Sequence, residues 1–541
     1  MTALQHSLLA VLALGFVAGA RAQTTSCPPR PAPGTVMSNP PQVTSQNGVL
    51  NASFTFRSSF DVEGYLHECY IYQTGQGPVE APTLRLDPGD QLVLNFTDRL
   101  TYVPPPPPGQ AVAMSPAAMK AMKGMAPRTT PNNPCTGGTM VATSTNVHFH
   151  GLNIPPICHE DEILTTDIEN TDPPFEYNFQ IPANDAPGMY WYHPHLHGFV
   201  TLQVNGGAPG ALIINGIEKL KPQVAGLPER VFVVRQQFTN ANSWIPGPSQ
   251  LTLNYQQAIA PISPSPIIKM KPGVKEFWRV ANASSQTFLA LQVQLGSAPE
   301  MLEVIELDGI PVAAPMVVST VNIPPAGRAE FIVQGPAANQ TASFQQVGFN
   351  TGPIGNPNLA QELATIQSSG DAQEPPALPA APAQAPATPL RFAGLATAAV
   401  TAKRKIYFAE ATNGSNGPTE FFITVDGQKP KVFSMSDPPA ITTTVGAVED
   451  WTVENRTGET HAFHIHQIHF LFLAVSGVPF ATPDLRDTVI VPAWSGTGPY
   501  PTVTLRMDFR EPQIAGRFVY HCHILDHEDA GMMAIIQVNP K

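Results

Sequence analysis

The sequence predicts an all-β protein built from three consecutive domains, each a β-sandwich or barrel. The 541 residues include 59 prolines and 41 glycines, which disfavour long helices and favour short strands joined by turns. One pattern also occurs three times: a glycine turn, an alternating strand, and an aspartate or asparagine nine residues after the glycine. The three copies span Leu84–Asp98, Met270–Asn282 and Thr444–Asn455.

This repeat divides the chain into units of similar size. Its glycines, Gly89, Gly273 and Gly446, are 184 and 173 residues apart. Each unit is long enough for one sandwich or barrel. We therefore expect a first domain over 23–217 with a Pro- and Met-containing insertion over 104–134, a second over 218–370, a Pro- and Ala-rich linker over 371–397, and a third over 398–541.

The first 22 residues are typical of a secretory signal peptide. An apolar run over Leu8–Val17 is followed by an A-x-A type cleavage site over Ala20–Ala22. We therefore expect an exported protein, either periplasmic or secreted. Such a protein can keep disulfides. If Cys522 is used otherwise, four cysteines remain for up to two bridges, and the sequence leaves their pairing open; they are Cys27, Cys69, Cys135 and Cys158.

Charge and hydropathy exclude two classes of partner. Lys and Arg number 29 against 41 Asp and Glu, so the net charge is −12 and a basic nucleic-acid-binding surface is not expected. Hydrophobic residues make up 43% of the chain, enough for packed cores, but no other apolar stretch is long enough to span a bilayer. We expect a monomer with no nucleic-acid or membrane partner.

Ten of the 15 histidines lie in four short motifs. On a strand, residues i and i+2 point to the same face, so each His-x-His pair presents two imidazoles side by side. Eight imidazoles are too many for one metal ion, and two zinc sites or one multinuclear centre both fit the pattern. We expect no ligand role for His6, His67, His159, His197 and His469. The pairs are His148 with His150, His193 with His195, His464 with His466, and His521 with His523.

Cys522 indicates a second kind of metal site. It lies between His521 and His523, so its side chain points to the opposite face of the strand. Two histidines, a cysteine thiolate and a weak axial methionine are the ligands of a blue-copper electron-transfer site. His461, His527 and Met532 supply the remaining members of that set. We therefore expect copper, with two centres joined through adjacent residues.

The repeat also indicates which domain lacks metal. Leu291 and Val293 occupy the places in the second domain that His464 and His466 occupy in the third. We therefore expect metal ligands in the first and third domains only, with a shared centre at their interface.

These four motifs, in this order, resemble those of the multicopper oxidases, the laccase-like family. The resemblance implies three cupredoxin-like Greek-key domains, one-electron oxidation of a donor and reduction of O₂ to water. It also implies four copper ions: a type 1 copper on His461, Cys522, His527 and Met532, a type 2 copper on His148 and His464, and a type 3 pair on His150, His193, His195, His466, His521 and His523.

The resemblance further implies two residues that supply protons. Members of the family have an acidic residue near the trinuclear cluster on each side. Glu528, directly after His527, matches one of these positions. Asp161, eleven residues after His150, is the counterpart in the first domain. Both carboxyl groups are therefore expected to act in proton transfer.

The sequence leaves the electron donor open. A laccase-like oxidase takes phenols and aromatic amines. A cuprous or ferrous ion oxidase would want carboxylates or thioethers beside the type 1 histidines, and Glu459 and Asp487 are candidates. The methionines from Met114 to Met125 would suit Cu(I). A non-catalytic copper carrier explains the soft ligands but not a full oxygen-reducing set in two domains.

Overall fold

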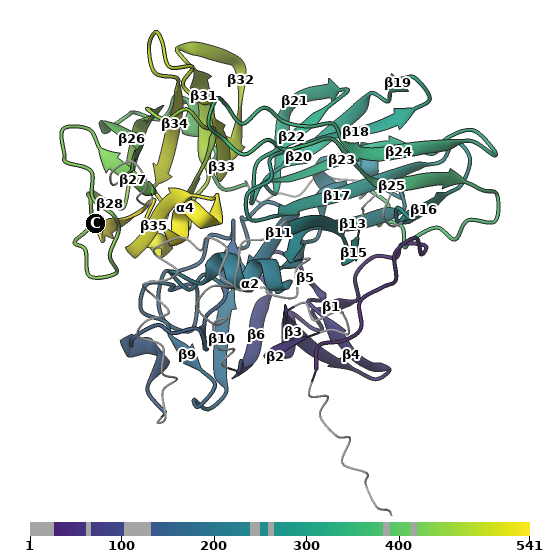
Figure 1. Cartoon of the computed structure of the whole chain (residues 1–541), viewed down its shortest axis with the longest axis horizontal. Coiled ribbons are helices and arrows are strands. Elements are labelled where there is room, and N and C mark those ends of the chain that lie inside the picture. Colours follow the sequence, from purple (N-terminus) through teal and green to yellow (C-terminus); the bar gives the residue numbers. More distant parts are fainter. Residues whose placement is uncertain are drawn as a thin grey trace, which may run out of the picture.

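The computed structural model describes residues 26–60, 66–101, 131–238, 249–257, 264–381, 390–412 and 419–541. The expected signal peptide and most of the Pro- and Met-containing insertion lie outside the described residues. Strands dominate and form three pairs of sheets, one pair after another along the chain (Figure 1). The predicted all-β class with three consecutive domains is confirmed.

The first domain has two five-stranded sheets around a shared apolar core. Its burial alternates along the strands, as expected when one face of a sheet meets a core. One sheet has the order β1 (Gln42–Thr44), β5 (Thr83–Leu86), β12 (Gly210–Ile214), β11 (Gly188–His193) and β8 (His148–His150). The other has the order β10 (Phe175–Gln180), β6 (Gln91–Arg99), β2 (Val49–Phe60), β3 (Leu66–Thr74) and β4 (Gly77–Glu80), and a short ladder joins β7 (Ser144–Thr145) to β9 (Ile168–Glu169).

The second domain pairs a seven-stranded sheet with a six-stranded one. The larger sheet has the order β15 (Gln256–Gln257), β14 (Ser249–Leu253), β13 (Glu229–Phe238), β17 (Lys275–Ala283), β23 (Arg328–Gln334), β20 (Leu302–Leu307) and β21 (Ile310–Val318). The smaller has the order β16 (Ile267–Met270), β25 (Gln361–Ser368), β24 (Thr341–Gln346), β18 (Leu289–Leu295) and β19 (Ala298–Pro299), with β22 (Val321–Ile323) also paired to β18.

The third domain has the same two-sheet construction. Its larger sheet has the order β27 (Thr419–Val425), β26 (Ala402–Thr412), β29 (Ala447–Asn455), β34 (Thr502–Phe509), β31 (Phe470–Val475) and β32 (Val478–Arg486). Its smaller sheet has the order β28 (Ile441–Thr444), β36 (Met533–Asn539), β35 (Gly516–Cys522), β30 (His461–Ile465) and β33 (Thr488–Val491).

The sequence repeat corresponds to one strand in each domain. These strands are β6, β17 and β29, and each pairs in parallel with an earlier strand and antiparallel with a later one. The repeated glycine therefore turns the chain into the same position of a sheet three times. This supports the interpretation of the repeat as a structural unit.

Within the described residues, the helical segments are short. They are η1 (Pro134–Thr136), α2 (Val200–Gly206), α3 (Ile217–Leu220), η2 (Pro222–Val224), η3 (Leu395–Thr397), η4 (Pro512–Ile514) and α4 (Leu525–Asp529). In the described part of the chain, none is long and apolar enough to cross a membrane. The α2 helix of the first domain packs on α4 of the third, and the Asp529 carboxylate accepts hydrogen bonds from the backbone N–H groups of Gly198, Val200 and Thr201.

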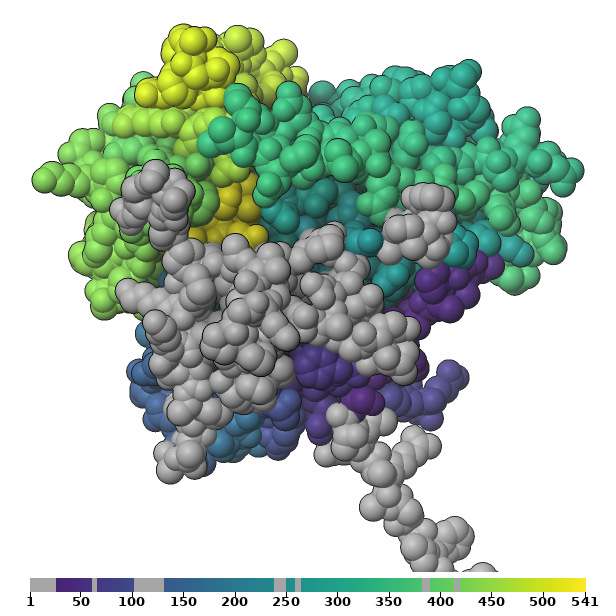
Figure 2. Space-filling view, viewed as in Figure 1, coloured from purple at the N-terminus to yellow at the C-terminus, as the bar shows by residue number. Residues whose placement is uncertain are grey.

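The second and third domains also contact each other, as Figure 2 shows from one side. Ile310 of β21 packs with Leu471 of β31 in an apolar cluster between them. The described part of the expected linker is bonded to the second domain. The Leu378 N–H donates to the Leu227 carbonyl, and the Pro376 carbonyl accepts from the Glu229 N–H.

Four cysteines form two disulfides, both in the first domain. Cys27 bonds to Cys69 with a Cα–Cα distance of 6.0 Å, and Cys135 bonds to Cys158 with a Cα–Cα distance of 5.5 Å. Cys522 is free and buried. The structure thus gives the disulfide pairing that the sequence left open, and Cys522 stays available for another role.

Candidate metal centre

Two adjacent strands of the first domain bring four histidines together. In the antiparallel pair of β8 and β11, His148 lies opposite His193, and His150 lies opposite Trp191. His195 follows just after β11, and its N–H donates to the Asn146 side chain at 2.8 Å. All four imidazoles are buried. The i, i+2 spacing of the first motif therefore puts both of its rings on one side of the sheet.

Two adjacent strands of the third domain do the same. In the antiparallel pair of β30 and β35, His464 lies opposite His521, and Phe463 lies opposite Cys522. The backbone N–H of His523 donates to the Ala462 carbonyl at 2.7 Å, which continues this pairing past the end of β35. Backbone hydrogen bonds between β30 and the segment of β35 therefore fix the positions of these histidines.

The eight imidazoles from the two domains meet in one buried cluster. The ring of His148 stacks on that of His466 at 3.9 Å between centroids, and the ring of His150 stacks on that of His464 at the same distance. The Nε2 atom of His521 lies 3.2 Å from that of His466 and 3.4 Å from that of His195. The expected interface between first and third domains is thus where the eight rings lie; they belong to His148, His150, His193, His195, His464, His466, His521 and His523.

The cluster fits bound metal ions because it leaves buried ring nitrogens without partners. Burying an unpaired polar atom is costly, so such atoms indicate a ligand. The Nδ1–H groups of His148, His193 and His464 donate to Asp161, the Pro194 carbonyl and the Asp487 carbonyl, which leaves Nε2 of each ring free. The unpartnered atoms are Nε2 of His148, His193 and His464, Nδ1 of His150, His195 and His466, and both ring nitrogens of His523.

Burial also keeps these rings in the form that binds a metal. Burial, and then neighbouring imidazoles, lower the pKa of His148 and His466 well below the usual range. Burial lowers the pKa of His195 and of His521 to about 4. The imidazoles are therefore neutral at neutral pH, with a lone pair free for copper.

Asp161 and Glu528 both touch histidines of the cluster. The Asp161 carboxylate accepts from His148 Nδ1 at 2.9 Å, and Gln467 Nε2 donates to it at 2.6 Å. Glu528 lies 3.0 Å from His521 Nδ1 and 3.5 Å from His195 Nε2, without the alignment of a hydrogen bond. Burial raises the pKa of Asp161 well above its usual range, and that of Glu528 to about 7.

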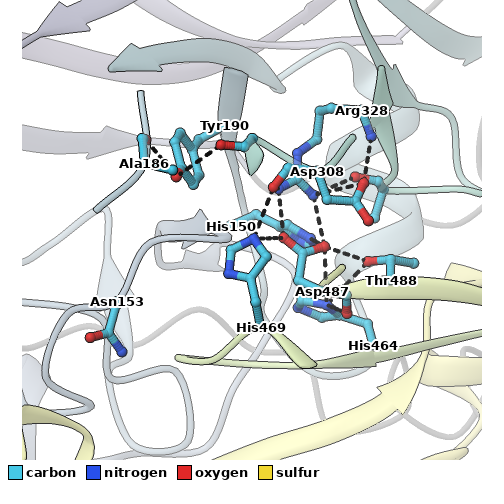
Figure 3. A network of polar contacts seen from close by, with 12 residues as sticks. His150, Asn153, Ala186, Tyr190, Asp308, Arg328, His464, His469, Asp487 and Thr488 are labelled. Carbon is cyan, nitrogen blue, oxygen red and sulfur yellow. Dashed lines mark hydrogen bonds and ion pairs between the residues drawn. The ribbon is translucent and has the colours of Figure 1, made fainter. Parts of the chain in front are cut away.

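Asp487 lies in this cluster and not at the place expected from the sequence. Its carboxylate lies 3.3 Å from His150 Nε2, and its backbone carbonyl accepts from His464 Nδ1 at 2.9 Å (Figure 3). The expectation that Asp487 stands beside the type 1 histidines is therefore wrong. Asp487 precedes β33, which pairs with β30 so that Thr488 lies opposite His464. That pairing places Asp487 over the eight-histidine cluster.

The second centre lies around Cys522, on the other face of β35. The Cys522 sulfur is 3.5 Å from His461 Nδ1 and 3.9 Å from His527 Nδ1. The Cys522 N–H donates to the Met532 carbonyl at 3.1 Å, which holds the Met532 backbone beside it. Burial raises the pKa of the Cys522 thiol, so a thiolate here requires a bound cation. One thiol and two facing imidazole nitrogens fit a blue-copper ligand set.

The outer edges of the two type 1 histidines meet carboxylates. His461 Nε2 donates to the Thr457 hydroxyl at 2.8 Å and lies 3.5 Å from Glu410. His527 Nε2 lies 3.1 Å from Glu459. Burial, and then the adjacent Glu410, raise the pKa of Glu459 to about 9. Although burial opposes it, contact with His461 lowers the pKa of Glu410, so Glu410 is the ionised member of the pair.

A surface cavity of about 400 Å³ opens at this edge. Glu410 and Thr457, which both contact His461, lie in its wall. Ile354, contributed by the second domain, and Trp494 add apolar surface. A molecule in this cavity would be separated from a type 1 ligand by a single side chain.

Sequence reasoning missed Glu410, Gln467 and Arg328. Glu410 and Arg328 act from distant positions in the chain, on His461 and Asp487, whereas Gln467 directly follows His466 but bonds to the distant Asp161. No local motif marks them. His197 packs against Phe433, and His469 Nε2 donates to the Asp308 carbonyl, so both have contacts outside the eight-ring cluster.

Comparison with known proteins agrees with this geometry. Three family models, each described as multicopper oxidase, match residues 139–219, 229–371 and 407–541. A laccase of Bacillus stratosphericus is 25% identical over 428 residues, which are 72% of this chain and 79% of the laccase. The multicopper oxidase LPR1 homolog 5 of Oryza sativa subsp. japonica is 24% identical over 455 residues, 73% of this chain and 68% of that protein.

The fold has a close counterpart among solved structures. A multicopper oxidase of Campylobacter jejuni, described as a metallo-oxidase, superposes with a TM-score of 0.66 at 21% identity, over 95% of this chain and 96% of that one. The three-domain cupredoxin fold expected from the sequence is thereby confirmed.

Proposed function

The chain belongs to the multicopper oxidase family, and on this premise we propose that its electron donors are phenols and aromatic amines, as in a laccase. It is a copper-dependent oxidoreductase that uses O₂ as acceptor. The observation that carries the choice of donor is the cavity at His461. It combines apolar walls from Ile354 and Trp494 with a carboxylate, Glu410, that can accept the proton an oxidised phenol loses.

We assign four copper ions to the two clusters. Copper bound there would supply the redox chemistry: four one-electron oxidations of the donor would balance the reduction of one O₂, with four protons, to two molecules of water. His461, Cys522, His527 and Met532 would hold the type 1 ion. His148 and His464 would hold the type 2 ion, and His150, His193, His195, His466, His521 and His523 the type 3 pair.

The chain itself provides the electron path and the protons. Cys522 is joined through the backbone to His521 and His523, so a few covalent bonds connect the two clusters. Asp161 and Glu528 contact different histidines of the oxygen-reducing cluster and are proposed to pass protons to it. Glu528→Gln should slow O₂ consumption while leaving the blue absorption unchanged.

Substitution of Glu410 tests the proposed donor. In Glu410→Gln, kcat/KM for a dimethoxyphenol should fall about tenfold or more, because the proton acceptor is lost. Oxidation of ferrocyanide, which has no proton to lose, should change less. Asp450→Asn, which removes a surface carboxylate paired with Arg506, is the matched control. Equal losses with both donors would contradict the role of Glu410.

Oxidation of Fe(II) is a second candidate, favoured by the two carboxylates. Glu410 and Glu459 offer oxygen ligands beside both type 1 histidines. Neither methionine nor cysteine lines the described cavity, so Fe(II) suits it better than Cu(I). O₂ uptake measured with phenol, Fe(II) and Cu(I) in turn separates these donors. A copper carrier would consume O₂ with none of them.

We also propose that the protein is exported and acts as a monomer. The signal-like residues 1–22 support export, and two disulfides suit an oxidising compartment. N-terminal sequencing of protein recovered outside the cytoplasm should begin near residue 23. Light scattering of the purified protein should give the mass of one chain.

A further inference from the structure

The second domain supplies none of the assigned copper ligands, yet one of its side chains reaches the eight-histidine cluster. Arg328, at the start of β23, is buried. Its Nη1 donates to Asp487 Oδ1 at 2.8 Å, and its Nη2 donates to Asp487 Oδ2 at 2.5 Å (Figure 3). A bidentate pair of this kind fixes the plane of the carboxylate as well as its position.

The remaining N–H groups of Arg328 fix the guanidinium itself. Nε donates to the Met189 carbonyl of the first domain at 3.2 Å. Nη1 and Nη2 also donate to the carbonyls of Ala326 and Asp308 in the second domain, at 3.1 and 3.0 Å. With Asp487 from the third domain, all five N–H groups have acceptors, and one side chain bonds to all three domains.

Asp487 passes this constraint to one histidine from each side of the cluster. Its Oδ1 lies 3.3 Å from His150 Nε2, in the first domain. Its carbonyl accepts from His464 Nδ1, and Thr488 Oγ1 donates to its Oδ1 at 2.9 Å. In each ring the other nitrogen is buried without a partner: Nδ1 of His150 and Nε2 of His464. The same two rings stack on each other at 3.9 Å.

The space around this contact leaves little room for movement. A Cβ atom placed on Gly151, directly after His150, would lie 2.6 Å from Arg328 Nη2 and 2.8 Å from Asp487 Oδ2. The backbone beside the first histidine motif therefore approaches the ion pair closely. Glycine is required here both for this approach and for its φ of 90°.

We propose that Arg328 is a positioning residue for the copper ions assigned to His150 and His464. It fixes Asp487, whose carboxylate orients the His150 ring and whose backbone carbonyl orients the His464 ring, so the ligand-free second domain sets the geometry of the oxygen-reducing site. This inference rests on the proposed copper assignment. Residues that orient metal ligands in this way typically change metal affinity or activity 10- to 100-fold when substituted.

Arg328→Lys tests the proposal, because lysine keeps the charge but loses the bidentate contact. Copper per chain and the type 2 electron paramagnetic resonance signal are measured beside the blue absorption. We expect an altered type 2 signal or loss of copper from the histidine cluster, with the blue absorption retained. An unchanged type 2 signal with full copper content would overturn the proposal.

Arg279→Lys is the matched control. Arg279 is equally buried in the second domain and donates to Glu229 and Glu330 at 2.6 and 2.7 Å, away from the histidines. Arg279→Lys should lower thermal stability about as much as Arg328→Lys does but leave the type 2 signal intact. The same spectral change in both variants would mean a general effect of breaking a buried ion pair, and would also overturn the proposal.

A double variant keeps the proposal testable if Arg328→Lys does not fold. Arg328→Met with Asp487→Asn removes both charges together and avoids an uncompensated buried charge. It should fold, retain the blue absorption and still show the altered type 2 signal; a normal signal would contradict the proposal. The unsubstituted protein is measured first. If it fails to bind four copper ions, the proposed function fails; if it binds four and the variants match it, only this inference fails.

Discussion

The second and third domains share a scaffold and differ in the strand that follows it. In both, a tryptophan Nε1 donates to a glutamate that also binds an arginine: Trp278 with Glu276, and Trp451 with Glu449. In both, an asparagine side chain accepts from the N–H and hydroxyl two residues later: Asn282 with Ser284, and Asn455 with Thr457.

The next strand then carries different side chains in the two domains. The second domain has Phe288, Leu291 and Val293, which are buried in apolar clusters. At the same distances from the asparagine, the third domain has His461, His464 and His466. The common scaffold therefore fixes where side chains point, and three residue types decide whether that place is an ordinary core or a set of metal ligands. Folding of the second domain should not depend on copper, whereas the histidine clusters should gain stability from it.

The largest effect should come from substitution of Cys522. The second domain contains no cysteine, so it has no counterpart of this residue. Cys522→Ser removes the thiolate of the type 1 site. The blue absorption and turnover should both be lost, while the three coppers of the histidine cluster stay bound. Absorption spectra, copper analysis and O₂ uptake measure this. Normal oxidase activity in Cys522→Ser would refute the connection between the centres.

A matched pair on β18 and β30 tests the copper dependence directly. Leu291→Ala should destabilise the protein by about 2–5 kcal/mol, because it opens a cavity in an apolar core, and the loss should be the same with and without copper. His464→Ala should abolish O₂ reduction and keep the blue absorption. Its stability loss should appear mainly in the copper-loaded protein. Thermal unfolding of both variants, loaded and metal-free, is the measurement; equal copper dependence would break the comparison.

The asparagines of the shared scaffold give a smaller effect. Asn282→Ala and Asn455→Ala should each cost about 1–3 kcal/mol, because each leaves buried backbone groups unpaired. Only Asn455→Ala should also shift the blue absorption band, since Thr457 contacts both Asn455 and His461. Denaturant unfolding and visible spectra of the two variants test this. A spectral shift in Asn282→Ala would contradict it.

The smallest effect is expected from the insertion, which the second domain does not share. Deletion of residues 111–126, which lie outside the described residues, should leave phenol oxidation largely intact. O₂ uptake with phenol and with Cu(I) is the measurement. If Cu(I) oxidation alone collapses, the methionines from Met114 to Met125 serve a cuprous substrate.

Sequence reasoning was strongest where the signal is local. Strand periodicity gives the face of each His-x-His pair, and Cys522 between two histidines points the other way for the same reason. The repeat predicts no metal ligands at Leu291 and Val293, and both side chains lie in an apolar core. Asp487 was a candidate for a place beside the type 1 histidines but lies at the eight-histidine cluster, because its place depends on the pairing of β33 with β30. Arg328 and Glu410 carry no local signature, since each acts through contacts made across the fold.

Five of the twelve assigned ligands stand beyond residue 520, on β35 and just after it. A growing chain cannot complete either centre until this segment has been synthesised and β35 has entered between β30 and β36. Full copper loading of both centres therefore requires that this segment is present and paired.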